Sequence, residues 1–290
     1  MATSDPIDVD RTAPPFNRFT SLQWLAPARS GRRSAEHGRH HLFVGRDRVS
    51  RADLLIKLTS KPGLLYQRDL SNEIATLTAI NRSLPDSRSF PIVDEHGQLR
   101  DGRVYLVMSL FAELPLAMVI GPERVAARLV AHLRTSIAIA NVLSELHQVS
   151  IVHVDLNPMN ILYRVEKGKP VIRIVDFESS YDATRYADGD FYSPPTTSGF
   201  CAPEVQAQAP DARADLFSLG AVLYTLLAGY DWTWRGEVGA SIKDDADLDE
   251  ELKELLLRAT ASTPEERYAS ADAFRDAIVL YLERIWPGRA

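Results

Sequence analysis

The sequence has 290 residues, 45% of them hydrophobic and 25% charged, with a formal net charge of −6 at pH 7. This composition is that of an ordinary globular protein, and the acidic balance argues against a surface that tracks polyanions, so we expect no nucleic-acid partner. The single cysteine, Cys201, excludes an internal disulfide and fits a reducing, cytoplasmic compartment. No stretch approaches the roughly 20 apolar residues that span a bilayer, so we expect no membrane span.

The first third of the sequence reads as a small sheet with one helix. Residues 1–18 are rich in Asp, Thr and Pro and are expected to form a loose, flexible tail. Short apolar runs then predict strands, and a run with apolar residues at helical spacing predicts a helix. The strands are 21–25, 41–44, 53–58, 91–93 and 104–108, the helix is 68–80, and the turn before the last strand is 94–102.

After Met108 the sequence becomes mainly helical. Helix-forming residues with apolar stripes predict helices, and two short apolar runs predict a pair of strands. The helices are 122–146, 215–229, 247–260 and 270–285, and the strands are 161–163 and 171–175. We therefore expect an α+β protein with a small sheet-rich lobe over residues 19–110 and a larger helical lobe over residues 111–287.

One short loop, residues 153–160, carries most of the chemistry. It places His153, Asp155 and Asn160 between a predicted helix and a predicted strand. A second acid, Asp176, follows the next strand. Two carboxylates and a carboxamide beyond strand ends indicate a site for a divalent metal and phosphate, because hard cations prefer oxygen ligands.

This spacing resembles the catalytic loop of the eukaryotic-like Ser/Thr protein kinases found in bacteria and eukaryotes. In that family a His-Arg-Asp triplet is followed five positions later by Asn, and an Asp-Phe-Gly triplet carries a metal-binding Asp. Each triplet of this sequence departs from the pattern by one residue: His153-Val154-Asp155 and Asp176-Phe177-Glu178. The resemblance covers about residues 20–286 and implies a bilobal protein-kinase-like fold.

The resemblance assigns roles to residues along the whole chain. Lys57 resembles the strand lysine that holds the α- and β-phosphates, and Glu73 resembles its ion-pair partner on the following helix. Asp155 is expected to orient the attacking hydroxyl, so catalysis is assigned to Asp155, Lys57 and Glu73. Mg²⁺, or Mn²⁺, is expected on Asn160 and Asp176. ATP binding is assigned to Lys57, Met108, Ser109, Leu110, Phe111, Asn160, Leu162 and Asp176, with Met108 as gatekeeper of the hinge between the lobes.

Further matches lie in the helical part. Ala202-Pro203-Glu204 resembles the motif that ends the activation segment, and Arg267 is placed like the arginine that pairs with the Glu of that motif. Asp215 opens a stretch similar to the central helix whose Asp supports the catalytic loop. Thr197 is placed like a threonine of the Ser/Thr-kinase substrate segment, which favours Ser or Thr over Tyr as the acceptor.

The glycine-rich phosphate loop of the family is missing. Residues 29–38 contain two glycines at the wrong spacing, so the close backbone approach to phosphates that glycine permits is lost. Arg32 or Arg33 either replaces that loop by side-chain charge or belongs to a solvated basic turn.

Substitutions also lie beside the expected catalytic residues. Val154 replaces the arginine that receives an activation-segment phosphate, so we expect no switching by that route. Asn157 replaces a lysine that contacts the transferring phosphoryl group. Glu178 replaces glycine and is either an added carboxylate near the metal or a solvent-facing variant. Asp-Phe-Glu and Asp-Leu-X-Pro-X-Asn are also similar to kinase domains of class III lanthipeptide synthetases, which act on peptides.

The sequence therefore predicts an ATP- and Mg²⁺-dependent kinase acting on Ser or Thr hydroxyls of a protein or peptide. Two alternatives stay open. A regulatory binding module of the pseudokinase type is consistent with the missing glycine loop and with Val154, Asn157 and Glu178. The other is a small-molecule kinase, against which the activation-segment motif and Arg267 argue.

Overall fold

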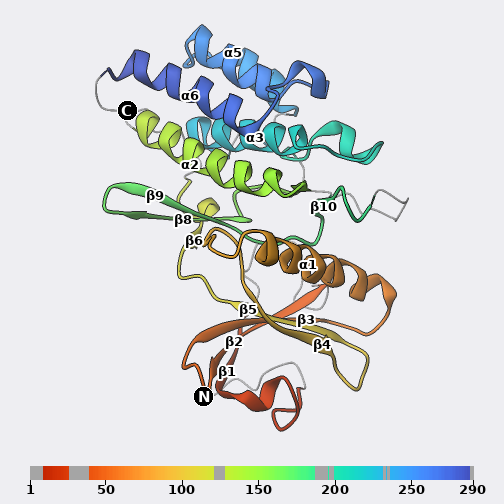
Figure 1. The fold of residues 1–290 in the computed structure, drawn as a ribbon. Helices are drawn as coiled ribbons and strands as arrows, with labels where there is room; N and C mark the ends of the chain where they lie inside the picture. Colours follow the sequence, from red (N-terminus) through yellow and green to blue (C-terminus); the bar gives the residue numbers. More distant parts are fainter. Residues whose placement is uncertain are drawn as a thin grey trace. The chain divides into compact units, whose positions relative to one another are not determined.

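The structure, a computed structural model, describes residues 9–25, 39–120, 128–186, 195, 199–230, 233 and 236–287. The chain divides into two compact units (Figure 1). The first comprises Met1–Arg82 and Pro91–Ala112, and the second comprises Ser83–Phe90 and Glu113–Ala290. The described elements of the first unit are mainly strands and those of the second are mainly helices, which confirms the predicted α+β class.

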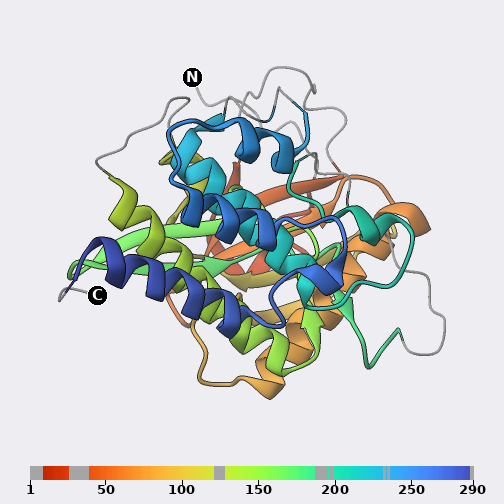
Figure 2. The ribbon, with the colours of Figure 1, turned by 90° about the horizontal axis from the view of Figure 1, so that it is seen from above.

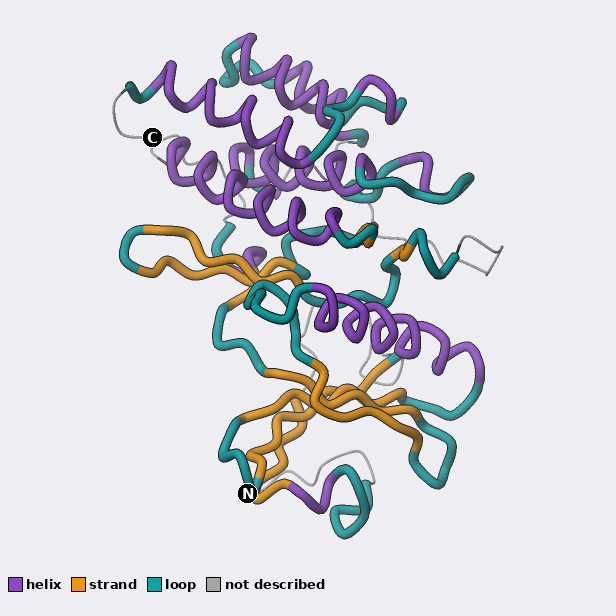
Figure 3. Tube along the Cα trace, viewed as in Figure 1, coloured by secondary structure: helices purple, strands orange, loops and turns teal. Residues whose placement is uncertain are grey.

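The first unit is built on a five-stranded antiparallel sheet with the order β1-β2-β3-β5-β4. Figure 3 draws its strands in orange. Its elements are β1 (Phe19–Leu25), β2 (His40–Asp47), β3 (Asp53–Thr59), α1 (Leu64–Ser83), β4 (Val93–Gln98) and β5 (Val104–Ser109). Phe43, Ile56 and Val107 pair across β2, β3 and β5 and are fully buried. Such cross-strand rows of aromatic and β-branched residues are the unit of sheet stabilisation, so they form the core of this unit.

The short helix η1 (Phe16–Arg18) precedes β1 and packs against the sheet. Phe16 is buried, with its ring edge-to-face against Phe43 at a centroid distance of 5.9 Å. Arg18 Nε donates to Asp47 Oδ2 of β2 at 2.7 Å, and Arg18 Nη1 donates to Glu95 Oε2 of β4 at 2.9 Å. Because β2 and β4 are not neighbours in the sheet, this guanidinium joins two separate strands. Residues of the segment expected to be a loose tail are thus part of the packed unit.

Strand β4 continues to Gln98, whereas the sequence predicted a turn over residues 94–102. The polar residues that indicated a turn are accommodated because β4 is an edge strand, which can leave one face in water. Glu95 is half-buried there, and its Oε1 accepts a hydrogen bond from the Tyr105 hydroxyl at 2.9 Å. The turn that follows uses Gly102, whose φ of 87° lies in the left-handed region that favours glycine.

The second unit is mainly helical (Figures 1 and 2). Its helices are α2 (Leu129–Gln148), η3 (Leu116–Met118), η5 (Pro203–Gln206), α3 (Arg213–Ala228), α4 (Val238–Asp244), α5 (Glu250–Ala259), η7 (Pro264–Glu266) and α6 (Ala271–Ile285). Its strands form two small sheets, β6 (Leu114–Pro115) with β8 (Ile161–Glu166) and β9 (Lys169–Ile174), and β7 (Ile151–Val152) with β10 (Tyr181–Asp182). Every residue from Ala214 to Leu227 of α3 is buried, as expected for a helix that is apolar on all sides, and α2, α5 and α6 pack against it.

The helix ends differ slightly from the predicted ones. Helix α5 begins at Glu250 rather than at 247, because the Asp249 side chain accepts the Leu252 N–H at 2.8 Å and so caps the helix. Helix α4 was not predicted, since seven residues are too few for a clear apolar period. Residues 121–127, at the start of predicted helix 122–146, lie outside the described residues.

Among the described helices, none combines the length and apolar content that a bilayer crossing requires.

Gly220 lets α3 approach the end of α5 closely. A methyl group at Gly220 would lie 2.8 Å from Ala259 Cβ and 2.8 Å from Thr260 Cγ2. We expect Gly220→Ala to lower the free energy of unfolding by about 1–3 kcal/mol, because the helices must separate. Gly239→Ala in α4 is the matched control, since no heavy atom lies within 4 Å of that methyl position. Urea unfolding of both variants checks this, and an equal loss in both would contradict it.

Candidate active site

In the first unit, Lys57 and Glu73 form a buried ion pair. Lys57 lies on β3, between Leu42 of β2 and Leu106 of β5, so it is on an inner strand. Its Nζ lies 2.7 Å from Oε2 of Glu73 on α1, and the two side chains are 9% and 0% exposed. The ion pair predicted from the sequence is present. A buried cation must be paired in this way, since an isolated charge is strongly disfavoured in the protein interior.

The stretch assigned to the hinge lies at the end of β5, also in the first unit. Met108 is buried and pairs with Leu55 of β3. Ser109 is held twice by Ile92: its N–H donates to the Ile92 carbonyl at 2.9 Å, and its Oγ accepts the Ile92 N–H at 2.9 Å. Leu110 and Phe111 follow outside any strand. Two hydrogen bonds to Ile92 thus fix the backbone at the end of β5, directly after the buried Met108.

In the second unit, Asp215 of α3 holds the loop 153–160. The Asp215 carboxylate is fully buried and accepts the backbone N–H groups of His153 and Val154, each at 2.8 Å. His147, at the end of α2, places Nε2 at 2.9 Å from the same carboxylate. Val154 has a φ of 69°, which is strained for a β-branched residue, so these hydrogen bonds hold the loop in a conformation it would otherwise leave.

Two carboxamides clamp the loop beyond Asp155. The Asp155 carbonyl accepts Asn157 Nδ2 and Asn160 Nδ2, both at 2.9 Å. Asn157 Oδ1 also accepts the Met159 N–H at 2.9 Å. From the sequence, Asn157 was noted only because it replaces a lysine of the family. In the structure its side chain stabilises the loop through these two hydrogen bonds.

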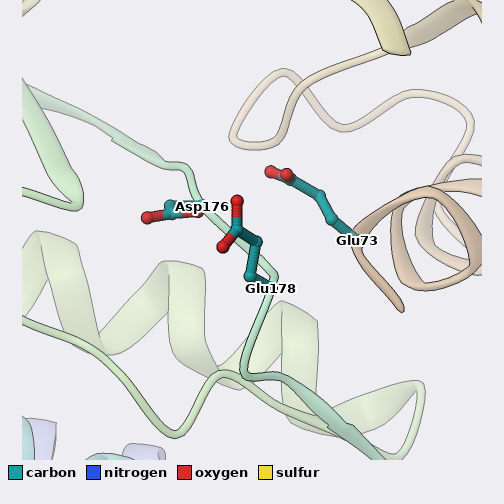
Figure 4. A group of neighbouring side chains, drawn as sticks. All are labelled: Glu73, Asp176 and Glu178. Carbon is teal, nitrogen blue, oxygen red and sulfur yellow. The ribbon is translucent and has the colours of Figure 1, made fainter. Parts of the chain in front are cut away.

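The Asp-Phe-Glu triplet follows β9 in the second unit. Phe177 is fully buried, and its ring centroid lies 4.9 Å from that of His153 and 6.0 Å from that of Phe90. Figure 4 shows the carboxylates of Asp176 and Glu178 side by side on this segment, and also draws Glu73 of the first unit. One oxygen of Asp176 and one of Glu178 lie within 4.8 Å of each other. Glu178 is half-buried. Glu178 therefore lies close to Asp176 and is only partly exposed.

The donors assigned to the metal lie at one end of a strand pair. Asn160 precedes β8 and Asp176 follows β9, and these strands pair Ile161 with Ile174. The Val175 N–H donates to the Asn160 carbonyl at 3.0 Å, which continues the ladder to this end. Amide and carboxylate oxygens are the donors that Mg²⁺ and Mn²⁺ accept, so the residues present fit such an ion.

Leu162, the remaining residue that the sequence assigned to the nucleotide, lies on β8. It is half-buried and pairs with Arg173 of β9 and Pro115 of β6. It belongs to the second unit, as do Asn160 and Asp176, whereas Lys57 and the hinge stretch belong to the first.

Glu204 and Arg267 form the predicted buried pair. Arg267 Nη1 lies 2.6 Å from Glu204 Oε1 and Nη2 lies 2.7 Å from Oε2, so the pair is bidentate. The Arg267 side chain is fully buried, and it also donates to the carbonyls of Ala261 and Arg213 at 2.8 and 3.0 Å. This geometry ties η5, which follows Ala202, to the loop after α5.

Cys201 does not have the environment of a nucleophile. Burial raises the pKa of its thiol to about 11, and the nearby carboxylates of Asp155 and Glu204 add to this effect. The thiolate is the reactive form of cysteine, so Cys201 is unreactive near pH 7.

Sequence reasoning missed two side chains that shape the site. His147 contacts Asp215, and Phe90 contacts Phe177, yet both partners are distant in sequence. The one available signal for His147 was its place near the end of a predicted helix, directly ahead of the loop. Predicted features outside the described residues are the loop 29–38 with Arg32 and Arg33, and Thr197.

Comparison with known proteins agrees with this fold and geometry. Residues 88–279 match the protein kinase domain. Ribosomal protein S6 kinase alpha-2 of Homo sapiens is 45% identical over 94 residues, covering 32% of this chain and 13% of that protein. Serine/threonine-protein kinase Pkn1 of Myxococcus xanthus is 30% identical over 201 residues, covering 62% of this chain and 28% of that protein. The chain thus spans well under a third of either relative. It belongs to the protein kinase domain family.

The buried pair Glu204–Arg267 gives a stability test. We expect Arg267→Lys to lower the free energy of unfolding by about 2–3 kcal/mol, because Lys keeps the charge but loses the bidentate fork and the buried carbonyl contacts. Arg284→Lys is the control, since Arg284 and its partner Glu251 are 51% and 50% exposed and such pairs contribute about 0–1 kcal/mol. Denaturant unfolding measures both, and the interpretation of the pair is wrong if the two losses are alike.

Proposed function

We propose that this protein is an ATP- and Mg²⁺-dependent kinase that phosphorylates Ser or Thr hydroxyls of a protein or peptide. The hydroxyl oxygen forms a bond to the γ-phosphorus, and the bond from that phosphorus to the β,γ-bridging oxygen breaks. ADP leaves with the electron pair, and the hydroxyl proton passes to Asp155. The similarity to kinase domains of class III lanthipeptide synthetases adds a peptide to the expected acceptors.

The buried Lys57–Glu73 pair is the observation that carries this proposal. Taking both charges out of water costs free energy that the attraction between them often fails to recover, so a buried ion pair is weak evidence of a stabilising role. A binding scaffold gains nothing from holding an ammonium group there. A kinase does, because the ammonium binds the α- and β-phosphates and the carboxylate keeps it in place.

The loop 153–160 supplies the second part of the proposal. In this proposal Asp155 orients the acceptor hydroxyl and takes its proton, while Asp215 and Asn157 fix the backbone that carries it. The family resemblance assigns adenine binding to Met108 and the three residues after it, and also to Leu162. Asn160 and Asp176 would hold the divalent cation, which would supply positive charge that stabilises the phosphates.

Regulation by activation-segment phosphorylation is not part of this proposal. Val154 stands where the family's phosphate-binding arginine stands, and its side chain is fully buried and apolar. It offers no charge to a phosphate.

The paired Glu204 and Arg267 favour a protein or peptide acceptor over a small molecule, because they hold together the segment that a protein kinase uses to receive its substrate. The pseudokinase alternative predicts nucleotide binding without transfer, and the following experiments separate it from the kinase.

Replacing both members of the Lys57–Glu73 pair separates the effect of the pair on stability from its effect on ATP binding. The double variant Lys57→Met/Glu73→Leu replaces buried charges by apolar groups of similar size, so we expect stability equal to or above that of the wild type. ATP binding should fall at least tenfold, which corresponds to about 1.4 kcal/mol. Thermal melting and calorimetric ATP titration measure the two quantities. Lys61→Met, at an exposed lysine of the same unit, is the control. Unchanged ATP affinity in the double variant would overturn the role of Lys57.

Asp155→Asn tests the chemical step. We expect phosphoryl transfer to a generic basic protein to fall by about 10²–10⁴-fold, because the amide cannot accept the hydroxyl proton. ATP affinity should stay within about twofold, since Asp155 is assigned to the acceptor and not to the nucleotide. Radiolabelled ATP with Mg²⁺ or Mn²⁺ measures transfer, and Asp86→Asn, at an exposed position, is the control. Wild-type protein that binds ATP but transfers nothing would favour the pseudokinase.

A further inference from the structure

We infer that Tyr181, Arg185 and Tyr186 form an aromatic cluster that holds the turn after β10 and thereby positions the loop 153–160. The cluster is built from unmodified side chains, so the turn is held without a phosphate. The effect of the cluster on phosphoryl transfer rests on the proposed function, whereas its effect on the turn does not.

The pairing of β10 with β7 is short. Each strand has two residues, and the register places Tyr181 opposite Val152. One further hydrogen bond, from the Ala183 N–H to the Ser150 carbonyl at 3.2 Å, extends the pairing. A short two-stranded ribbon is marginally stable in water, and closing the long stretch of chain between these strands costs entropy. The pairing therefore needs support from side chains.

The chain turns back directly after β10. Asp182 is buried, and its Oδ1 accepts the Thr184 N–H at 2.9 Å and the Thr184 hydroxyl at 2.6 Å. The Asp182 carbonyl also accepts the N–H groups of Arg185 and Tyr186 at 3.1 and 3.0 Å. An Asp side chain that binds the backbone two residues further on is a common way to form a turn. This turn brings Tyr186 back to Tyr181.

The two tyrosine rings are stacked across this turn. The ring centroids of Tyr181 and Tyr186 are 5.3 Å apart, and the ring planes differ by 12°. The guanidinium carbon of Arg185 lies 4.8 Å from the centroid of the Tyr186 ring, and Nη2 donates to the Tyr186 hydroxyl at 2.8 Å. All three side chains are half-buried. Stacked rings and cation–aromatic contacts are both favourable beyond the area that they bury, so the cluster stabilises the turn and, with it, β10.

The cluster acts on the loop 153–160 through β7. Val152, which pairs with β10, directly precedes His153, whose N–H donates to Asp215 at 2.8 Å. The backbone is therefore fixed by β10 where it enters the loop and by Asp215 inside it. A small displacement of a catalytic group lowers the rate strongly, because transfer requires a near-attack geometry. In this inference Tyr186 is a positioning residue for the proposed reaction.

The cluster takes over a task that protein kinases commonly give to a phosphate. Phosphorylation orders their activation segment through pairs between the phosphate and arginine side chains. Residues 181–186 lie in the segment that the family resemblance assigns to this role. Val154 is fully buried and apolar, so the loop 153–160 offers no arginine at that position. Stacking within residues 181–186 supplies order that does not depend on modification.

The test compares the full wild-type chain with Tyr186→Ala, which removes one ring of the stack. We expect hydrogen exchange over residues 181–186 to become about tenfold faster, because the turn opens more often. The kcat of transfer to a generic basic protein should fall about tenfold, while KM for ATP stays within about twofold, since the loop and not the nucleotide is displaced. Tyr186→Phe keeps the stack and should stay within about threefold of the wild type in both measurements. Ala183→Ser, at an exposed position of the same turn, is the control.

A phosphatase that acts on Ser, Thr and Tyr tests the independence from phosphate. We expect hydrogen exchange over residues 181–186 of the treated wild type to stay within about twofold of the untreated protein, once mass spectrometry shows that no phosphate remains. Clearly faster exchange after this treatment would overturn the inference, because the turn would then depend on a phosphate.

Melting curves establish that each variant is folded at the assay temperature. Exchange in Tyr186→Ala as slow as in the wild type would overturn the inference. Faster exchange with an unchanged kcat would overturn the positioning of the loop. A wild type that transfers no phosphate removes the proposed kinase, and the exchange measurements then still decide whether the cluster holds the turn.

Discussion

The buried carboxylate of Asp215 is the group on which the loop of the candidate site depends. Burying a carboxylate is strongly unfavourable unless donors surround it, and here two backbone amides and an imidazole do so. The amides belong to His153 and Val154, so the hydrogen bonds that satisfy the acid also hold Val154 at its positive φ. The direction of the chain after that residue, and hence the positions of Asp155 and Asn160, follow from this one interaction.

The ion pairs Lys57–Glu73 and Glu204–Arg267 lie in different units, and they differ in what they do for the fold. Arg267 donates to Glu204 and to several carbonyls, so its charge is matched by hydrogen bonds on every side and it joins distant segments. Lys57 has the flexible stem of a lysine, and its ammonium group lies on the carboxylate of Glu73. The planar guanidinium of Arg makes several fixed hydrogen bonds at once and so suits a permanent structural contact. The compact ammonium group of Lys, on its flexible stem, suits a ligand that binds reversibly.

Much of this arrangement was predictable from the sequence, because it follows from motif spacing and from the periodicity of apolar residues. The positions of Asp155 and Asp176 follow from motif spacing, and the helices of the second unit follow from apolar periods. The extent of β4 was not predictable, since its polar residues are tolerated only because the strand ends up at an edge of the sheet. The contacts of His147 and Phe90 depend on segments that meet only in the folded chain. The partial burial of Glu178 and its closeness to Asp176 likewise depend on the folded chain.

The contacts of Arg18 have a consequence for how this protein behaves among other copies of itself. An edge strand presents unpaired backbone groups, and β4 is such a strand. The Arg18 guanidinium donates hydrogen bonds to Asp94 and Glu95 of β4, at 2.5 and 2.9 Å. The same guanidinium also donates to Asp47 on β2. The strand is thereby held at two adjacent residues, and charged groups on an edge strand discourage a second chain from adding to the sheet. A cation placed ahead of β1, at one edge of the sheet, thus contributes charge contacts to β4, at the opposite edge.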